Sequence, residues 1–142
     1  MDVTLILLTP QFYDDYSHCP EIMQKKDRPH VQARVEVDGV LFGIPLRSHI
    51  NHPHVVWTDR ANRCGLDLSK AIVITNAEKY IDTKTPLIRK NEYDALRGRE
   101  RIVIAGLVRY IARYKEAKAN QSDPVNLMLV KRSALQYFEE YL

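Results

Sequence analysis

The sequence predicts an α+β fold: a twisted antiparallel β-sheet core, a long packed helix and short peripheral helices in a single domain, residues 1–142. Residues 31–46 have the alternation and turn of a β-hairpin, and residues 99–119 carry apolar side chains at helical spacing. A chain of 142 residues with 45% hydrophobic and 27% charged residues is typical of one compact domain. No internal repeat, low-complexity tract or linker divides it.

The first part of the chain predicts one strand and two short helical turns. Residues 3–8 are apolar on both faces of an extended chain, which predicts a central strand, and Pro10 ends it. Residues 11–16 and 21–24 then fit short helical turns on either side of Pro20.

The hairpin is the clearest β signal. Apolar residues alternate with polar ones over residues 31–37, and Asp38-Gly39 supplies the positive φ angles of a tight turn. Residues 40–46 are β-branched and aromatic enough to form the partner strand. Because Pro45 cannot donate a ladder hydrogen bond, we expect an edge or a bulge there, with the chain leaving the sheet towards the histidines that follow.

Shorter elements follow the hairpin. Residues 55–58 predict a short strand, residues 59–65 a polar connection, and residues 71–75 a third core strand. Residues 90–97 predict a short helix that ends at Gly98.

The long helix is predicted over residues 99–119. Steps of 100° per residue place Arg109 and Arg113 opposite an apolar stripe that should pack on the sheet. The stripe consists of Val103, Ile104, Leu107, Val108, Ile111 and Tyr114.

The C-terminal part is less regular. Residues 120–124 predict a loop, and residues 125–130 either a strand or a buried extended segment. Ser133 and Gln136 match a reciprocal capping box, which predicts a final helix ending near Tyr141.

Composition limits the function classes. No apolar run is long enough for a membrane span, and residues 3–8 lack the flanks of a signal peptide, so we expect a cytoplasmic protein without membrane partners. Cys19 and Cys64 have no CxxC spacing and are expected to be reduced. The net charge is only +3, but residues 97–118 hold seven bases against two acids. Such clustering indicates either an anionic partner or a solvated helix face.

The candidate chemistry lies in the loop after the hairpin, where three histidines fall within six residues. The sequence has no accompanying cluster of Cys, Asp or Glu at ligand spacing, so it predicts neither a metal site nor a cofactor. Ser48 has no GxSxG motif around it, and there is no Walker, GxGxxG or HExxH motif.

Imidazole, hydroxyl and guanidinium groups together suit metal-independent RNA cleavage. That reaction needs a base for the 2′-hydroxyl, an acid for the leaving 5′-oxygen and cations for the charged transition state. Histidine titrates in the required range, and arginine matches phosphate geometry. The alternative from composition is a polar loop whose histidines only cover the sheet edge.

Three motifs resemble the TenpN branch of type III toxin-antitoxin endoribonucleases, which is related to ToxN and to the phage-abortive AbiQ proteins. They are RPH, FGIPLRSHINH and GLDLSKAIVI, within a similarity that runs from about Phe12 to Tyr114. The resemblance implies an endoribonuclease toxin that leaves a 2′,3′-cyclic phosphate on cellular or phage RNA. It also implies a small repeat RNA antitoxin, folded as a pseudoknot, that the toxin processes and binds in a toxin-RNA hetero-oligomer.

The resemblance also implies residue roles. Ser48 matches the hydroxyl at the end of the IPL-x-S strand, but Arg47 replaces the family's threonine, and the family's lysine after the serine is missing. Arg28 or His30 matches a basic residue at the start of the hairpin. Tyr13 matches an N-terminal active-site tyrosine. Lys70 matches a lysine whose role is structural or catalytic.

Residues and resemblance together predict two sets of functional side chains. The catalytic set is Tyr13, Arg28, His30, Arg47, Ser48, His49 and His52. The RNA-binding set is Lys25, Lys26, Arg34, His54, Lys70, Arg109 and Arg113. A non-catalytic RNA- or DNA-binding regulator is the alternative function.

Overall fold

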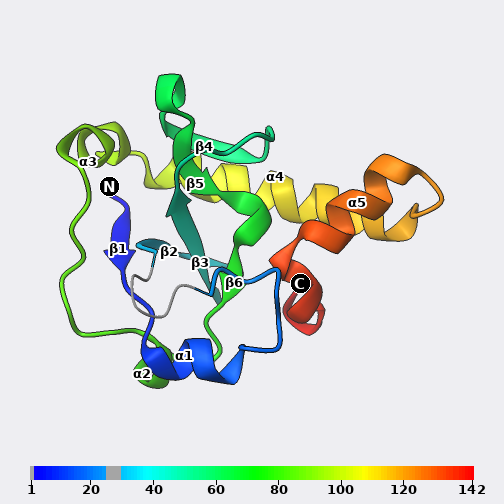
Figure 1. The fold of residues 1–142 in the computed structure, drawn as a ribbon, viewed down its shortest axis with the longest axis horizontal. Helices are drawn as coiled ribbons and strands as arrows, with labels where there is room; N and C mark the ends of the chain where they lie inside the picture. The colour runs from blue at the N-terminus through cyan, green and yellow to red at the C-terminus, as the bar shows by residue number, and fades with distance from the viewer. Residues whose placement is uncertain (1, 25–29) are drawn as a thin grey trace.

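The predicted α+β architecture is confirmed by the computed structural model, which describes residues 2–24 and 30–142 (Figure 1). Within these residues the sheet is antiparallel, with strand order β1-β2-β3-β5-β4, and β6 pairs with β3. The strands are β1 (Thr4–Ile6), β2 (Gln32–Val37), β3 (Val40–Arg47), β4 (Val55–Asp59), β5 (Cys64–Asp67) and β6 (Ile72–Val73). The α-helices are α1 (Pro10–Asp15), α2 (Ala77–Tyr80), α3 (Lys90–Leu96), α4 (Glu100–Ala119) and α5 (Pro124–Arg132). The 3₁₀ turns are η1 (Arg60–Asn62), η2 (Leu68–Lys70), η3 (Ala134–Tyr137) and η4 (Glu139–Tyr141).

The hairpin is formed by β2 and β3 in the predicted register. Val37 pairs with Val40, and the turn residues Asp38 and Gly39 have φ angles of 50° and 78°, as a tight two-residue turn requires. Ala33 is buried on one face of β2, whereas Arg34 is exposed on the other. Sequence alternation therefore predicted this hairpin correctly.

Pro45 lies inside β3, which continues to Arg47, so the predicted early exit from the sheet is wrong. On one side Pro45 pairs with Gln32 of β2. Because the Leu46 amide donates to Val31 on that same side, the Pro45 nitrogen points to the other side of β3. There the β6 pairing has ended and the β5 pairing begins at Leu46, so the missing N–H breaks no ladder bond.

Three strand predictions are corrected. The strand β1 pairs only with β2 and is therefore at the sheet edge, not central. The expected polar connection at residues 59–65 instead contains η1 and leads into β5, which pairs with both β3 and β4. The third core strand shrinks to the two residues of β6, because only Ile72 and Val73 pair with β3.

Helix α4 confirms the predicted long helix and covers the sheet through contacts with β2 and β4 (Figure 1). Its buried face is rotated from the predicted stripe, because Gly106 and Tyr110 are buried while Val108 is exposed. A Cβ at Gly106 would lie 3.1 Å from Val56 Cγ2, which shows how closely α4 approaches β4, and this tight contact would involve side-chain atoms only. As a result Arg113 borders the buried face instead of lying opposite to it.

The C-terminal predictions are corrected most. Residues 125–130 are helical, as part of α5, because the Asp123 carboxylate accepts from the Val125 amide and Pro124 occupies the first turn. The expected final helix is two 3₁₀ turns. Ser133 caps the first of them, but the Gln136 amide donates to carbonyl groups of residues 130, 131 and 133 and does not complete a capping box.

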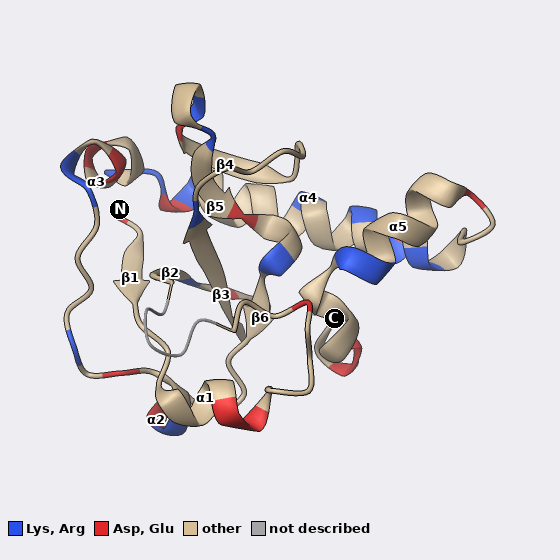
Figure 2. Ribbon diagram, viewed as in Figure 1, with Lys and Arg blue, Asp and Glu red and all other residues tan. Residues whose placement is uncertain are grey.

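The surface around α4 and α5 is basic. Figure 2 shows Lys and Arg residues spaced along α4 and at the C-terminal half of α5, which packs beside α4. None of the helices in the described ranges combines the length and apolar character needed to cross a bilayer.

Candidate functional site

The histidine loop, residues 48–54, connects β3 to β4 and is anchored from within. The Ile50 side chain is buried, and its amide donates to the Arg63 carbonyl at 3.1 Å. His49, just before it, takes a left-handed conformation with φ of 57°. The loop therefore has a defined shape, with His52 and His54 on the stretch that returns to the sheet.

Asp67, at the end of β5, is a fully buried carboxylate that joins three elements. It accepts hydrogen bonds from Arg47 Nη1 at 2.5 Å and from Ser69 Oγ at 2.6 Å, and it lies 3.1 Å from His52 Nε2. Burial by itself raises the pKa of Asp67, but the hydrogen bonds from His52, Ser69 and Arg47 outweigh burial and lower that pKa to about 2. Asp67 is therefore an anion that fixes the position of Arg47 and His52.

His52 has both ring nitrogens engaged. Nδ1 accepts from the backbone amide of His54 at 3.1 Å, so the proton of the neutral ring is on Nε2, which faces Asp67 and lies 3.3 Å from Ser69 Oγ. This assignment follows from the hydrogen-bond pattern. A ring held in this way orients the loop and is poorly placed to exchange a proton with a ligand.

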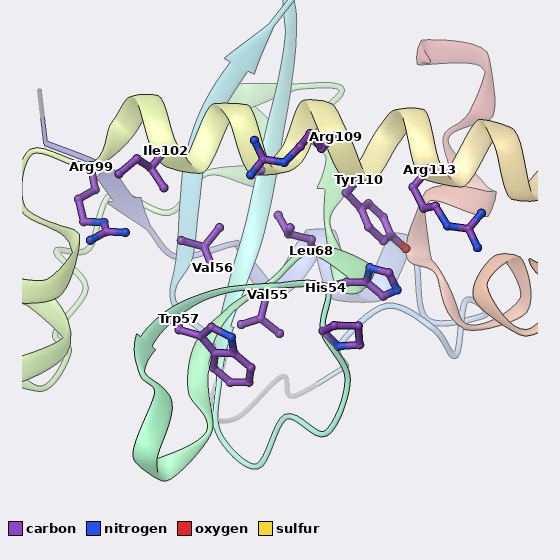
Figure 3. A pocket seen from close by; sticks show the side chains of 12 residues that line it. His54, Val55, Val56, Trp57, Leu68, Arg99, Ile102, Arg109, Tyr110 and Arg113 are labelled. Carbon is purple, nitrogen blue, oxygen red and sulfur yellow. The ribbon is translucent and has the colours of Figure 1, made fainter. Parts of the chain in front are cut away.

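His54 is the other loop histidine near Asp67. Its ring lies against the rings of His52 and Tyr110, with centroids 5.7 and 5.4 Å away, and Tyr110 is fixed by a 2.8 Å bond from its hydroxyl to Ser133. Burial is the largest cause that lowers the pKa of His54, and the charge of Arg113, joined by that of His52 when its ring is protonated, lowers it further, so the neutral form of His54 is favoured. Figure 3 shows His54 and Tyr110 close together beneath α4, with Arg113 beside them.

A cavity of about 850 Å³, here called the main groove, lies between the histidine loop and α5. One wall carries His52, His54 and three of the groove's four cations, whereas α5 contributes an apolar stretch that ends at the fourth cation, Arg132. The cations are Arg47, Lys70, Arg113 and Arg132. Two of them also brace α5: Lys70 Nζ donates to the Arg132 carbonyl at 2.7 Å, and Arg113 donates to Asn126 Oδ1 at 2.7 Å.

An adjoining cavity of about 410 Å³ extends the main groove along α4 and β4 (Figure 3). The two cavities share Pro53, His54, Tyr110 and Arg113 as lining residues, and the second adds Arg99 and Arg109. His54 therefore lies where they join, and a chain-like anion could pass it on both sides.

A third cavity, of about 310 Å³, lies on the other side of Arg47 and is here called the Ser48 cavity. It is lined by Ser48, His30, Arg89 and Glu92 as well as Arg47. His30 Nδ1 lies 3.1 Å from the Leu46 carbonyl, so the start of β2 does run beside the end of β3, as the hairpin predicts. Ser48 and His52, expected in one centre, thus lie in separate cavities that share Arg47.

The remaining predicted residues fall outside these cavities. Tyr13 is buried in the core against Phe12, and His49 and Arg34 are exposed but line none of the three cavities. Predictions were also made for three residues that lie outside the described ranges, namely Lys25, Lys26 and Arg28.

Sequence reasoning missed four residues of the site: Asp67, Ser69, Tyr110 and Arg132. The only local signal was an aspartate inside the otherwise apolar run GLDL, since a charge is seldom buried without partners. The two cysteines are free and buried, and no group of three or more His, Cys, Asp or Glu in the described ranges is arranged to hold a metal ion.

Comparison with known proteins finds no family model, no curated protein and no solved structure that matches this chain. Any functional assignment therefore rests on the motifs quoted above and on the geometry of these cavities.

Proposed function

We propose that this protein is a metal-independent endoribonuclease, the toxin of a type III toxin-antitoxin system, which leaves a 2′,3′-cyclic phosphate. A small repeat RNA that folds as a pseudoknot would inhibit it by occupying the same groove, and the toxin would process that RNA. We place it in the cytoplasm, where cellular and phage RNA are its substrates in abortive defence against infection.

The observation that carries this proposal is the position of His54 in the main groove. An imidazole whose pKa is lowered by burial lies among Arg47, Lys70, Arg113 and Arg132, and none of these four cations is part of the apolar core. RNA cleavage needs such a pairing, because a base must remove a proton close to cations that hold the phosphate. The resemblance of the hairpin and loop motifs to the toxin family supports the same reaction.

The residues of the groove divide the steps as follows. His54 takes the proton from the 2′-hydroxyl, and the 2′-oxygen bonds to phosphorus while the bond from phosphorus to the 5′-oxygen breaks. Arg47 and Arg113 hold the phosphate oxygens as charge develops. Lys70 lies in the same groove, and burial lowers the pKa of its ammonium group, so it is our candidate for protonating the leaving 5′-oxygen.

A non-catalytic RNA-binding regulator is the second candidate. The observation that favours it is that both ring nitrogens of His52 are engaged. Of the two loop histidines in the main groove, only His54 is then positioned to exchange a proton, whereas cleavage needs both a base and an acid. A protein that only bound RNA would need the cations but no base.

We expect His54→Gln to lower the rate of RNA cleavage by about a hundredfold to ten-thousandfold, because a positioned base contributes about that much. The matched control is His49→Gln, since His49 belongs to the same loop but lines none of the three cavities. Cleavage of a short single-stranded RNA in EDTA, with analysis of the 3′ ends, measures both.

The proposal requires full activity of the parent in EDTA, cyclic phosphate ends and a normal rate for His49→Gln. RNA binding without cleavage by the parent would favour the regulator. Cleavage by His54→Gln within about threefold of the parent, a loss under about 1 kcal/mol, would exclude His54 as the base.

A further inference from the structure

Helix α5 presents apolar side chains to the main groove, and one of them, Leu129, also packs against the core. Val125, Met128 and Leu129 recur at helical spacing along the groove side, whereas Asn126 and Val130 face inward and are buried. Val125 is 69% exposed and Met128 41% exposed. These three groove-side residues, here called the α5 wall, form an apolar surface in a groove that four cations also line.

The α5 wall is held in place by contacts at both ends of the helix. Asp123 caps the first turn, Arg113 of α4 donates to Asn126, and Lys70 donates to the Arg132 carbonyl at the last turn. The first contact caps the start of α5, and the other two join α5 to α4 and to η2. The wall is thus preformed, with a fixed separation from the cationic side of the groove.

We propose that the α5 wall is a seat for a nucleobase of the bound RNA, next to the phosphate held by Arg47 and Arg113. This inference rests on the proposed function. A nucleotide has a flat, weakly polar ring and an anionic phosphate, and the two walls of the groove match these two parts. Neither a purely apolar ligand nor a plain polyanion would use both walls.

The seat has a consequence for substrate choice. A base in a duplex has its faces covered by its neighbours, so only an unpaired base can lie against Val125 and Met128. Because aliphatic side chains contact any base face, the seat selects unpaired nucleotides without strong preference among the four bases.

The test compares two ligands: a short single-stranded RNA and an abasic ribose phosphate oligomer of the same length. Both are titrated against the 142-residue protein carrying His54→Gln, which we expect to slow cleavage enough for binding to be measured. We expect Val125→Ser with Met128→Ser to weaken RNA binding about tenfold and to change binding of the abasic oligomer by less than about twofold. Val108→Ser is the matched control, because Val108 is 46% exposed on α4 and does not line the main groove.

The outcomes separate this inference from the proposed function. If the protein without wall substitutions binds neither ligand, the proposed function fails, and capture of an acidic amphipathic peptide instead would assign the groove to a protein partner. If RNA binds but the wall substitutions have no effect, or weaken both ligands equally, RNA binding stands and the base seat is wrong. Val108→Ser should bind both ligands like the parent.

Discussion

Asp67 positions two side chains of the main groove without lining the groove itself. Its carboxylate is fully buried, yet it orients the Arg47 guanidinium and the His52 ring, and through the His54 amide bonded to His52 it reaches the proposed base. A carboxylate with these partners is an anion at neutral pH. Removing its charge would leave two cationic or polar groups without the partner that fixes them.

We expect Asp67→Asn to lower the free energy of unfolding by about 3 kcal/mol at neutral pH, because a buried ionic group loses its charge while its partners remain. The contribution also depends on pH. The folded-state pKa of about 2 is below the ordinary 3.8, so the stabilisation is complete above about pH 4. It is lost as pH falls towards 2, an effect of about 2 kcal/mol.

Denaturant unfolding of the parent and of Asp67→Asn between about pH 2 and pH 7 measures the difference in their free energies of unfolding. This difference should become smaller in acid. Asp38→Asn is the control, since Asp38 is exposed in a turn that asparagine also accommodates. A gap for Asp67→Asn that stayed constant across the whole pH range would show that charge is not what Asp67 contributes.

At the scale of elements, local patterns predicted the hairpin and α4 but not the connections between them. The alternation around Asp38-Gly39 and the 3.6-residue period need only neighbouring residues. The strand β5 is only four residues long and is defined by its pairing with β3 and β4, not by a pattern of its own, and α5 was missed although Asp123-Pro124 is a usual helix start.

The same difference between local patterns and long-range packing explains which parts of the site could be predicted. Arg47 ends β3, and His52 and His54 follow it in the next loop, so their proximity to one another could be predicted from the hairpin. Their partner Asp67 and the α5 wall come from separate elements, and only the packing of those elements brings them to the groove. Ser48 was separated from His52 by the turn at His49, which no local pattern indicated.

The pairing of β4 with β5 positions the histidine loop, and Gly65 makes that pairing possible. A Cβ at Gly65 would lie 2.5 Å from the Val56 carbonyl oxygen and 2.7 Å from Val55 Cγ1. We expect Gly65→Ala to destabilise the protein by about 2 kcal/mol or more, because backbone must move. Gly106→Ala is the control: its new methyl would meet only side chains, and alanine favours the helix.

Thermal unfolding measures both variants, and Gly106→Ala should remain within about 1 kcal/mol of the parent. If Gly65→Ala unfolded like the parent, the close approach of β4 to β5 would not be the feature that holds the loop.

Across the whole molecule, the main groove and the cavity beside it form one path from α5 to the start of α4. Arg113 lines both cavities and Arg109 the second, and His54 lies at the junction. A path of this kind suits a phosphate backbone, since each phosphate it holds is balanced by a cation and releases counterions. The net charge of +3 is modest, so the placement of cations decides where an anion binds.

We expect the affinity for single-stranded RNA to fall steeply with salt, and Arg109→Gln with Arg113→Gln to make that fall shallower. Each lost phosphate contact should reduce the slope of log affinity against log salt by about 0.7, so the double variant should lose about 1.4. Arg34→Gln with Arg101→Gln removes the same charge from exposed positions outside the three cavities and should keep the parental slope. Because Arg113 also bonds Asn126, thermal unfolding must first show that the double variant is folded. Equal slopes for the two double variants would mean that bound RNA does not follow α4.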